Sequence, residues 1–384
     1  MQAAKQEPQP ESKAVPVRPL VTEPVWALGL MSGTSLDGVD AAIVRTDGEV
    51  IVETGPALTV PYDGDLRERI RGVLGAEKLA RSAASVARAV TLAHVEAVRI
   101  LFARSGFPAR EVTVIGFHGH TILHRPDAGI TRQIGDGGLL AKLTGTAVVN
   151  DFRTADVLAG GQGAPLVPLF HRALARDLPR PLAILNLGGV GNVTWIGEGE
   201  RDEQILAFDT GPGNALIDDW VRRHTGRAFD ENGAIAAAGL VDQTALAALL
   251  ANPFFAKRPP KSLDRNHFNI TALAALGVND GAATLAAFTA ASVAQSQAHL
   301  PTPPKQWLVT GGGRHNGALM TALRQGLAAP VLPVESVGWD GDALEAQAFA
   351  FLAVRSLREL PLSLPRTTGV GKPMPGGRLH LPAA

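Results

Sequence analysis

The sequence contains no cysteine, so disulfide bonds, thiolate nucleophiles and cysteine-ligated zinc sites are excluded. It also has no net charge, because its 36 lysines and arginines balance its 36 aspartates and glutamates. A neutral chain lacks the basic surface with which proteins bind nucleic acid or anionic membranes. No apolar run reaches the roughly 18 residues that a membrane-spanning helix needs. We therefore expect a globular protein whose partners include neither nucleic acid nor a membrane.

Two common nucleotide-binding signatures are absent as well. No G-x-x-x-x-G-K-[ST] loop occurs. The pair Gly371-Lys372 is followed by Pro373 and has no glycine at the required upstream spacing. No G-x-G-x-x-G fingerprint stands between an expected strand and an expected helix. If this chain binds a nucleotide, it must use other turns.

Composition divides the chain into a tail and a folded part. Residues 1–24 are rich in Gln, Glu, Lys and Pro and poor in apolar side chains, so we expect a disordered tail. This tail lacks the apolar core of a secretory signal. Hydrophobic residues make up 46% of the 384 residues, enough for two or three domains or one two-lobed unit. We expect an N-terminal lobe over 25–180 and a C-terminal lobe over 181–384.

Three glycine-bearing turns, each preceded by a short apolar strand, are the main pattern of the chain. The first joins the expected strands 25–28 and 41–44, and it contains two glycines, Gly33 and Gly38, with hydroxyls and carboxylates between and around them. Glycine lets a backbone approach a ligand closely, and successive N–H groups of a turn can bind an anion. This turn is either a phosphate-binding hairpin or an ordinary polar hairpin, and composition does not separate the two.

The second turn lies within 182–196 and repeats the order of strand, glycine turn and strand. The repetition indicates an internal repeat on the scale of a lobe. An expected strand at 206–209 follows and ends in the carboxylate of Asp209. The third turn, 311–316, follows the expected strand 306–310.

Helices and further strands fill the intervals between these turns. Helical periodicity covers much of 65–105 and 233–300, and 342–357 is the last strong helix. Further strands are expected at 51–54, 58–60, 112–116 and 147–149. The last two are followed by polar residues, at 117–121 and 150–156, where α/β proteins place ligand chemistry.

Six motifs in order resemble those of the anhydro-N-acetylmuramic acid kinase family, within the sugar kinase/heat-shock ATPase/actin superfamily. They are 31–40 (MSGTSLDGVD), 151–168 (DFRTADVLAGGQGAPLVP), 186–194 (NLGGVGNVT), 208–214 (FDTGPGN), 311–316 (GGGRHN) and 338–350 (GWDGDALEAQAFA). The resemblance covers about residues 25–371. It implies a two-lobed α/β fold of the actin-like ATPase (ribonuclease H-like) kind, with mixed sheets flanked by helices and a central cleft. It also favours a homodimer, and we expect a cytoplasmic protein.

Carried over residue by residue, the resemblance implies which groups bind ATP. The first phosphate hairpin would comprise Gly33, Thr34, Ser35, Leu36, Asp37, Gly38, Val39 and Asp40. The second would use Gly188, Gly189 and Asn192, and the adenosine would contact Gly311, Gly312 and Gly313. Phosphoryl transfer depends on positioning and charge neutralisation, which donor-rich turns and Mg²⁺ supply.

The implied reaction opens the intramolecular 1,6-anhydro ether of a cell-wall amino sugar with water and phosphorylates O6. Asp209 would be the general base, and the alternative is an N-cap or turn carboxylate. His120, Arg153, Asp156 and Glu345 would line the sugar side, although His120 stands where the family has Gln. The alternatives are a salt-bridged loop for Arg153 and Asp156, and a solvated helix carboxylate for Glu345.

The resemblance does not fix the ligands of Mg²⁺. Many superfamily members carry Asp at the position of Met31, and a thioether cannot replace a carboxylate around a hard cation. Asp37, Asp40 and Asp209 are the candidates. His118, His120 and His124 lie close in sequence, but no fourth ligand stands at a matching spacing, so we favour no metal there.

Two other functions stay open at this point. One is a non-catalytic, two-lobed ATP-binding switch, against which we note that no peptide-binding or DNA-binding module follows the second lobe. The other is a phosphatase of the same superfamily, which would release phosphate without sugar. The basic run 261–265 is expected to be a surface turn rather than a phosphate contact.

Overall fold

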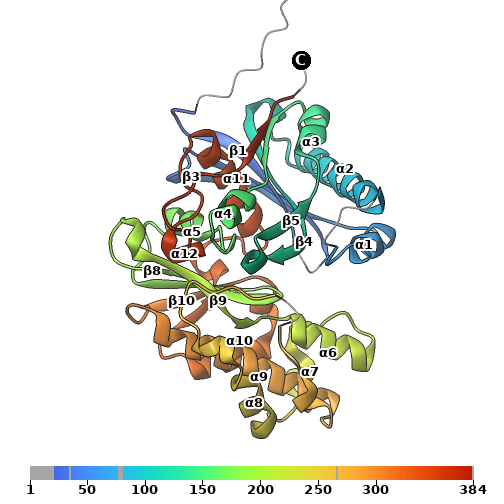
Figure 1. Cartoon of the computed structure of the whole chain (residues 1–384), viewed down its shortest axis with the longest axis vertical. Coiled ribbons are helices and arrows are strands. Elements are labelled where there is room, and N and C mark those ends of the chain that lie inside the picture. The colour runs from blue at the N-terminus through green and yellow to red at the C-terminus, as the bar shows by residue number, and fades with distance from the viewer. Residues whose placement is uncertain (1–20, 34–35, 77–80, 265–266, 383–384) are drawn as a thin grey trace, which may run out of the picture.

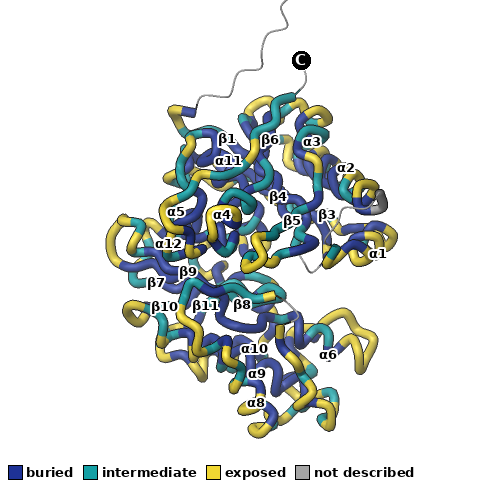
Figure 2. The backbone as a smooth tube through the Cα atoms, in the orientation of Figure 1, coloured by how far each residue is buried: buried dark blue, intermediate teal, exposed yellow. Residues whose placement is uncertain are grey.

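A computed structural model describes residues 21–33, 36–76, 81–264 and 267–382. Within these residues the chain forms two β-sheets flanked by helices (Figure 1). The predicted fold class, a two-lobed α/β protein with mixed sheets flanked by helices, is confirmed. Most strand residues are buried, whereas exposed residues gather on outer helices and loops (Figure 2).

The first sheet combines an antiparallel meander with strands added in parallel. Its strands are β1 (Val25–Ser32), β2 (Gly38–Thr46), β3 (Ile51–Pro61), β4 (Val112–Arg125), β5 (Ile130–Ile134), β6 (Ala147–Asn150) and β12 (Arg378–His380). They lie in the order β12-β6-β4-β1-β2-β3, and β5 pairs with β4. Because β4 is parallel to β1 and β6 is parallel to β4, these three strands end at one edge of the sheet.

The second sheet has the same arrangement of its five strands. They are β7 (Leu182–Leu187), β8 (Val190–Ile196), β9 (Ile205–Pro212), β10 (Gln306–Thr310) and β11 (Val331–Pro333). The order is β11-β10-β7-β8-β9, with β10 parallel to both β7 and β11. The meander β7-β8-β9 thus corresponds to β1-β2-β3, and the pair β10-β11 corresponds to β4-β6. The internal repeat predicted from the two hairpins is confirmed in this strand order.

Several strands differ from their predicted extents. The strands expected at 51–54 and 58–60 are one strand, β3, because an irregularity in its pairing with β2 accommodates Gly55 and Pro56 at the sheet edge. β4 continues to Arg125, so residues 117–121 are strand rather than loop and pair with β5 from His120 onward. β9 likewise continues beyond Asp209 to Pro212.

Helices cover the outer face of each sheet. On the first sheet these are α1 (Gly64–Arg71), α2 (Arg81–Ser105) and α3 (Gly137–Thr144), and on the second α9 (Val278–Ser296) and α10 (Gly317–Gly326). Each set buries one face of its sheet in a separate apolar core. The helices α6 (Ala215–Thr225), α7 (Ala234–Ala237) and α8 (Gln243–Leu250) form another core with α9.

A shared layer lies between the two sheets. Its main helices are α5 (Pro168–Leu174) and α11 (Leu344–Leu357), and the short helices α4 (Thr154–Leu158) and α12 (Pro365–Thr368) lie in the connections beside them. One core cluster contains Ala42 from the first sheet, Ile184 from the second and Phe351 from α11. The backbone of α11 approaches the first sheet so closely that a Cβ on Gly29 would lie 1.7 Å from the carbonyl oxygen of Ala346. The glycine on β1 is therefore required by packing.

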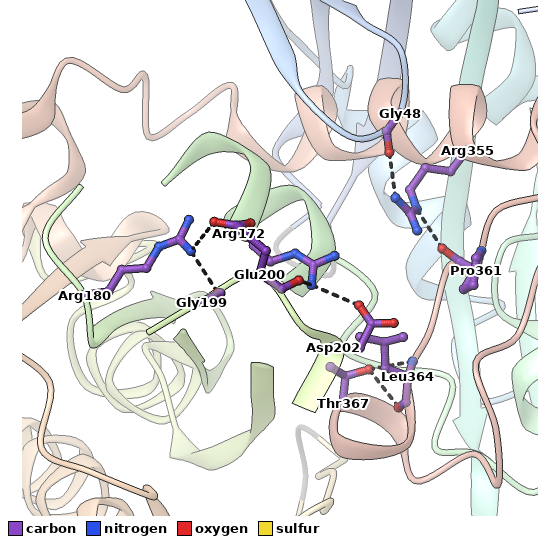
Figure 3. A network of polar contacts seen from close by, with 10 residues as sticks. All are labelled: Gly48, Arg172, Arg180, Gly199, Glu200, Asp202, Arg355, Pro361, Leu364 and Thr367. Carbon is purple, nitrogen blue, oxygen red and sulfur yellow. Dashed lines mark hydrogen bonds and ion pairs between the residues drawn. The ribbon is translucent and has the colours of Figure 1, made fainter. Parts of the chain in front are cut away.

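The last part of the chain returns to the first sheet. β12 pairs with β6, and α11 packs on β1, although both lie within 181–384. Arg355 of α11 donates to the carbonyl oxygens of Gly48 (2.6 Å) and Pro361 (2.7 Å), as Figure 3 shows. Arg172 of α5 meanwhile binds Asp202, in the connection between β8 and β9, at 2.9 Å. The boundary at 180/181 stays a prediction, and both segments 25–180 and 181–384 contribute to the layer between the sheets.

The ends of the described chain add two observations. Val21, within the predicted tail of 1–24, is buried in the shared core, and residues 1–20 lie outside the described residues. Among the described helices, none combines the length and the apolarity needed to cross a bilayer.

Candidate active site

The first glycine turn is fixed at both of its strands. The N–H of Leu36 donates to the carbonyl of Gly33 at 3.1 Å, and Leu36 has a φ of 63°, a left-handed conformation that is rare for such a residue. The carbonyl of Asp37 accepts from the N–H of Tyr62, at the end of β3, at 3.0 Å. Of the residues predicted to bind phosphate here, Thr34 and Ser35 lie outside the described residues, and Gly33, Leu36, Asp37, Gly38, Val39 and Asp40 form the turn and the start of β2.

The second glycine turn is held by the start of α6. The carbonyl of Gly188 accepts from the N–H of Asn214 at 2.7 Å, and that of Gly189 accepts from Gly213 at 3.0 Å. Because the C=O and N–H of a trans peptide point in opposite directions, the N–H groups of Gly189 and Val190 point away from α6. A pair of amide donors aimed the same way is suited to an anion such as a phosphate.

The third glycine turn lies against the second. Gly311 has a φ of 76°, and a Cβ there would lie 2.4 Å from Oδ1 of Asn186, at the end of β7. Arg314 donates to the carbonyl of Gly311 at 3.0 Å and forms ion pairs with Glu335 (2.7 Å) and Asp342 (2.8 Å). Gly312 and Gly313 follow Gly311 in the short turn before α10. The two turns predicted to bind the nucleotide in the second sheet are thus brought together.

Asp209 is buried next to the second turn. It pairs with Asn192 in the register of β8 and β9, and only 8% of its surface is exposed. Its Oδ2 accepts from the N–H of Leu263 at 2.7 Å. Burial raises the pKa of Asp209 to about 7, and the hydrogen bond from Leu263 together with the charges of Arg153 and Lys261 limits this rise. A carboxyl that titrates near neutrality, with one oxygen fixed, is suited to accept a proton from substrate.

Lys261 lies beneath Asp209 rather than on the surface, so the surface turn expected for 261–265 is wrong at this position. Its Nζ donates to the carbonyl of Phe254 at 3.2 Å and lies 4.4 Å from the centre of that ring. Its own carbonyl accepts from the N–H of Asp209 at 3.0 Å. Burial lowers the pKa of Lys261 to about 8. The segment after Pro260 therefore supports the candidate base.

The positive charge of Arg153 acts on both Asp209 and Glu345. The Nε of Arg153 donates to Nε2 of His118 at 3.1 Å, and its Nη1 donates to the carbonyl of Gly163 at 2.8 Å. Glu345, in the first turn of α11, accepts from Nδ2 of Asn186 at 3.1 Å. Burial raises the pKa of Glu345, and the positive charge of Arg153 counteracts this. Glu345 is thus half-buried and hydrogen-bonded rather than a solvated helix carboxylate.

Asp40 lies among carboxylates. Burial raises its pKa to about 6, and the charges of Glu345, Asp342 and Asp37 add to that rise, while a 2.6 Å hydrogen bond from Thr59 opposes it. No cluster of three or more His, Asp or Glu among the described residues could hold a metal ion alone. Mg²⁺ is usually held by one or two carboxylates with water and substrate phosphates, so such a cluster is not required. The charges that raise the pKa of Asp40 are all anionic, whereas the charges that act on Asp209 are those of two cations.

Asp156 joins two chain segments. One of its oxygens accepts from the N–H of Gly163 at 2.6 Å, and the other accepts from the hydroxyls of Ser363 and Thr368. The side chain is 2% exposed. This arrangement fixes the loop that holds Arg153, and a direct contact between Asp156 and the sugar stays a prediction.

The three clustered histidines have separate partners. His118 supports Arg153, His120 lies 2.9 Å from Oγ of Ser32, and His124 lies 3.0 Å from Oγ1 of Thr131. Burial lowers the pKa of each imidazole, so all three are neutral at pH 7. The predicted contact between His120 and the sugar is not tested by this geometry.

Sequence patterns did not reveal several groups of this site. Lys261 and the N–H of Leu263 follow two prolines, and a Pro-Pro-Lys-Ser sequence is typical of an exposed turn. Asn186 stands in a motif, but its contact with Glu345 joins residues from opposite ends of the second half of the chain. The sequence offered one signal for Asn186, because Asn186 is the polar residue that directly follows the apolar strand expected at 182–185.

The chain is similar in sequence to known proteins over most of its length. The family described as anhydro-N-acetylmuramic acid kinase matches residues 25–380. A protein of that name from Rhodospirillum rubrum is 60% identical over 363 residues, which are 94% of this chain and 95% of the relative. Another, from Paramagnetospirillum magneticum, is 58% identical over 359 residues, covering 93% and 99% of the two chains. Among solved structures, component A of (R)-2-hydroxyglutaryl-CoA dehydratase from Acidaminococcus fermentans has a TM-score of 0.47 at 10% identity, covering 87% of this chain and 99% of that chain.

Proposed function

Because the chain belongs to the anhydro-N-acetylmuramic acid kinase family, we propose that it opens the 1,6-anhydro ring of anhydro-N-acetylmuramic acid with water and phosphorylates O6 from ATP. The products are ADP and N-acetylmuramic acid 6-phosphate, so the reaction would serve cell-wall recycling. The observation that carries the chemical step is Asp209, a buried carboxyl with a pKa of about 7 beside the second glycine turn.

One base serves both parts of the reaction. Asp209 removes a proton from a water molecule as the water oxygen forms a bond to C1. The C1–O6 bond breaks, and O6 forms a bond to the γ-phosphorus as ADP leaves. The 2.7 Å hydrogen bond from Leu263 occupies Oδ2, which leaves Oδ1 to accept the proton. Arg153 and Lys261 keep the carboxyl sufficiently acidic to be ionised near neutral pH.

The glycine turns serve the nucleotide. The amide donors of Gly189 and Val190, with Asn192, would bind phosphate oxygens, and so would the first turn from Gly33 to Asp40. The turn from Gly311 to Gly313 would contact the adenosine. Backbone donors of this kind are positioned before the reaction, so they stabilise developing charge at little reorganisation cost.

Mg²⁺ would be held near Asp40, with Glu345 close by, through water and the phosphates. When bound, this ion neutralises charge on the phosphate oxygens. The support is the electrostatic setting, since carboxylates surround Asp40 whereas cations surround Asp209. Arg153 and Glu345 would contact the sugar, with Asp156 fixing the loop of Arg153.

The test is a product assay on the purified protein with ATP and Mg²⁺. We expect ADP release that depends on the anhydro sugar, and a 6-phosphosugar with one solvent oxygen at C1 when ¹⁸O-water is read before anomeric exchange. Free N-acetylmuramic acid is the control acceptor and would incorporate no oxygen through ring opening. Phosphate release without sugar would indicate a phosphatase, and ATP binding without turnover would indicate a switch, so either result overturns the proposal.

Two further proposals rest on the family resemblance alone. A homodimer would be detected as twice the chain mass by sedimentation equilibrium. A cytoplasmic location would place the protein in the soluble fraction after cell lysis, without export.

A further inference from the structure

Three buried polar side chains lie in a row beneath the first glycine turn. The hydroxyl of Tyr62 donates to Oγ of Ser32 at 2.7 Å, and Oγ of Ser32 lies 2.9 Å from Nδ1 of His120. Their exposed fractions are 5%, 1% and 0%. None of them takes part in the proton or phosphoryl transfers proposed above, so their burial needs another explanation.

The sheet itself assembles this row. Ser32 is the last residue of β1 and stands opposite His120 in the parallel register of β1 and β4. Tyr62 directly follows β3, and its backbone N–H donates to the carbonyl of Asp37 at 3.0 Å. Tyr62 therefore contacts the turn on both sides, at Ser32 where the chain enters and at Asp37 where it leaves.

Arg67 of α1 makes a second attachment to the same turn. Its Nε donates to the carbonyl of Leu36 at 3.1 Å, at the residue with the left-handed conformation. The guanidinium also reaches the carbonyl of Tyr62 at 3.5 Å. Tyr62 and Arg67 thus hold the outgoing side of the turn at two successive carbonyls.

The direction of the hydrogen bonds links the row into one unit. Because Oγ of Ser32 accepts from Tyr62, its own proton is available to Nδ1 of His120. The other ring nitrogen, Nε2, is buried without a hydrogen-bond partner among the described residues. Among the described residues, the side-chain hydrogen bond of this imidazole is therefore the one that orients Ser32, next to Gly33.

We propose that Tyr62, Arg67 and His120 are positioning residues that fix the first turn for the phosphates of the nucleotide, and that His120 acts on this turn rather than on the sugar. This inference rests on the proposed function, because that function makes the turn a phosphate site. The residue at position 120 would then matter for ATP through Ser32, which explains how histidine serves there in place of the family's glutamine.

The experiment compares the binding of ATP, which carries phosphates, with the binding of adenosine, which carries none. Binding of ATP and of adenosine is measured by calorimetry for wild type, Tyr62→Phe, His120→Leu and Arg67→Met, alongside the KM values for ATP and for the sugar. Loss of one buried hydrogen bond predicts a threefold to tenfold weaker binding of ATP, on the order of magnitude of such bonds. Adenosine affinity and the sugar KM are expected to stay unchanged.

Thr194→Val is the matched control. It removes a buried hydroxyl–imidazole contact of the same length, 2.9 Å to His171, but from the interior of the second sheet. We expect it to lower the melting temperature without a selective loss of ATP over adenosine. The comparison separates positioning of the turn from a general loss of stability.

Each outcome decides the question. Equal losses for ATP and adenosine, or ATP binding unchanged in all three variants, overturn the proposal. A higher sugar KM in His120→Leu with normal ATP binding makes His120 a sugar ligand and also overturns it. If Tyr62→Phe does not fold, Arg67→Met and His120→Leu provide the same test. Sugar-dependent ADP release by the wild type, measured first, distinguishes these failures from failure of the proposed function.

Discussion

The two sheets share one strand order but divide the chemistry between them. In the first sheet the row of paired residues next to the hairpin is Met31, Asp40 and Thr59, on β1, β2 and β3. In the second sheet Leu187 and Gly191 form the pair next to the hairpin, and the row behind them is Asn186, Asn192 and Asp209, on β7, β8 and β9. The carboxylate thus stands on the middle strand of the first meander and on the outer strand of the second.

This difference places the two carboxylates in opposite electrostatic surroundings. Asp40 lies near Glu345, Asp342 and Asp37, which favours a bound cation. Asp209 lies near Arg153 and Lys261, which compensate its charge without a metal. The repeat therefore provides two similar frames, one suited to holding a cation with phosphate and the other suited to a general base.

The largest effect is expected from the base position. Asp209→Asn removes the only proton acceptor in its row, so kcat should fall by about 10² to 10⁴-fold while ATP affinity is retained. Thr59→Val changes the outer-strand residue of the row in the first sheet, where only a hydrogen bond to Asp40 is lost, and kcat should change no more than severalfold. Steady-state kinetics and ATP calorimetry measure both. Full activity in Asp209→Asn would show that the base lies elsewhere.

The second prediction concerns how each sheet meets the shared helix layer. Gly29→Ala places a Cβ 1.7 Å from a backbone oxygen of α11, so the free energy of unfolding should fall by about 3 kcal/mol or more. Ile184→Val, on the second sheet, removes one buried methyl group and should cost about 1 kcal/mol. Gly64→Ala, with open space around it, is the neutral control. Denaturant unfolding decides, and equal costs for the two sheets would contradict this difference in packing.

Much of this frame could be predicted from local sequence. The three glycine turns, the strands before them and the carboxylate at Asp209 are all visible as short patterns. The packing of α11 and β12 on the first sheet could not be predicted from the sequence. The need for glycine at position 29 is recognised only once Ala346 is known to lie against it. The prediction of a surface turn is wrong at Lys261 for a similar reason, since the burial of Lys261 depends on Phe254 and on the backbone of β9 rather than on its neighbours in sequence.

The third prediction tests the proposed cation side. Asp40→Asn removes the proposed cation-binding carboxylate at the start of β2, so the Mg²⁺ concentration needed for half-maximal activity should rise about 10-fold to 100-fold. The kcat at saturating Mg²⁺ should fall much less than in Asp209→Asn. Asp37→Asn is the comparison variant, because among the charges of Glu345, Asp342 and Asp37 that of Asp37 contributes least to the pKa of Asp40. An unchanged Mg²⁺ requirement in Asp40→Asn would remove Asp40 from the cation site.

The smallest predicted effect is a shift in pH dependence on the base side. Lys261→Met retains the apolar stem but removes a charge that lowers the pKa of Asp209, so that pKa should rise above about 7. The base must be ionised to act, and activity therefore rises with pH through this pKa. The acidic limb of kcat/KM should move to higher pH by less than about one unit. The profiles of wild type and variant should converge above about pH 8, because burial lowers the pKa of Lys261 to about 8 and the wild-type lysine is then neutral as well.

Lys257→Met, at an exposed lysine nearby, is the control and should leave the acidic limb in place. Coincident profiles for all three proteins would mean that Lys261 does not influence the base, and the contrast between the two carboxylates would then rest on Arg153 alone.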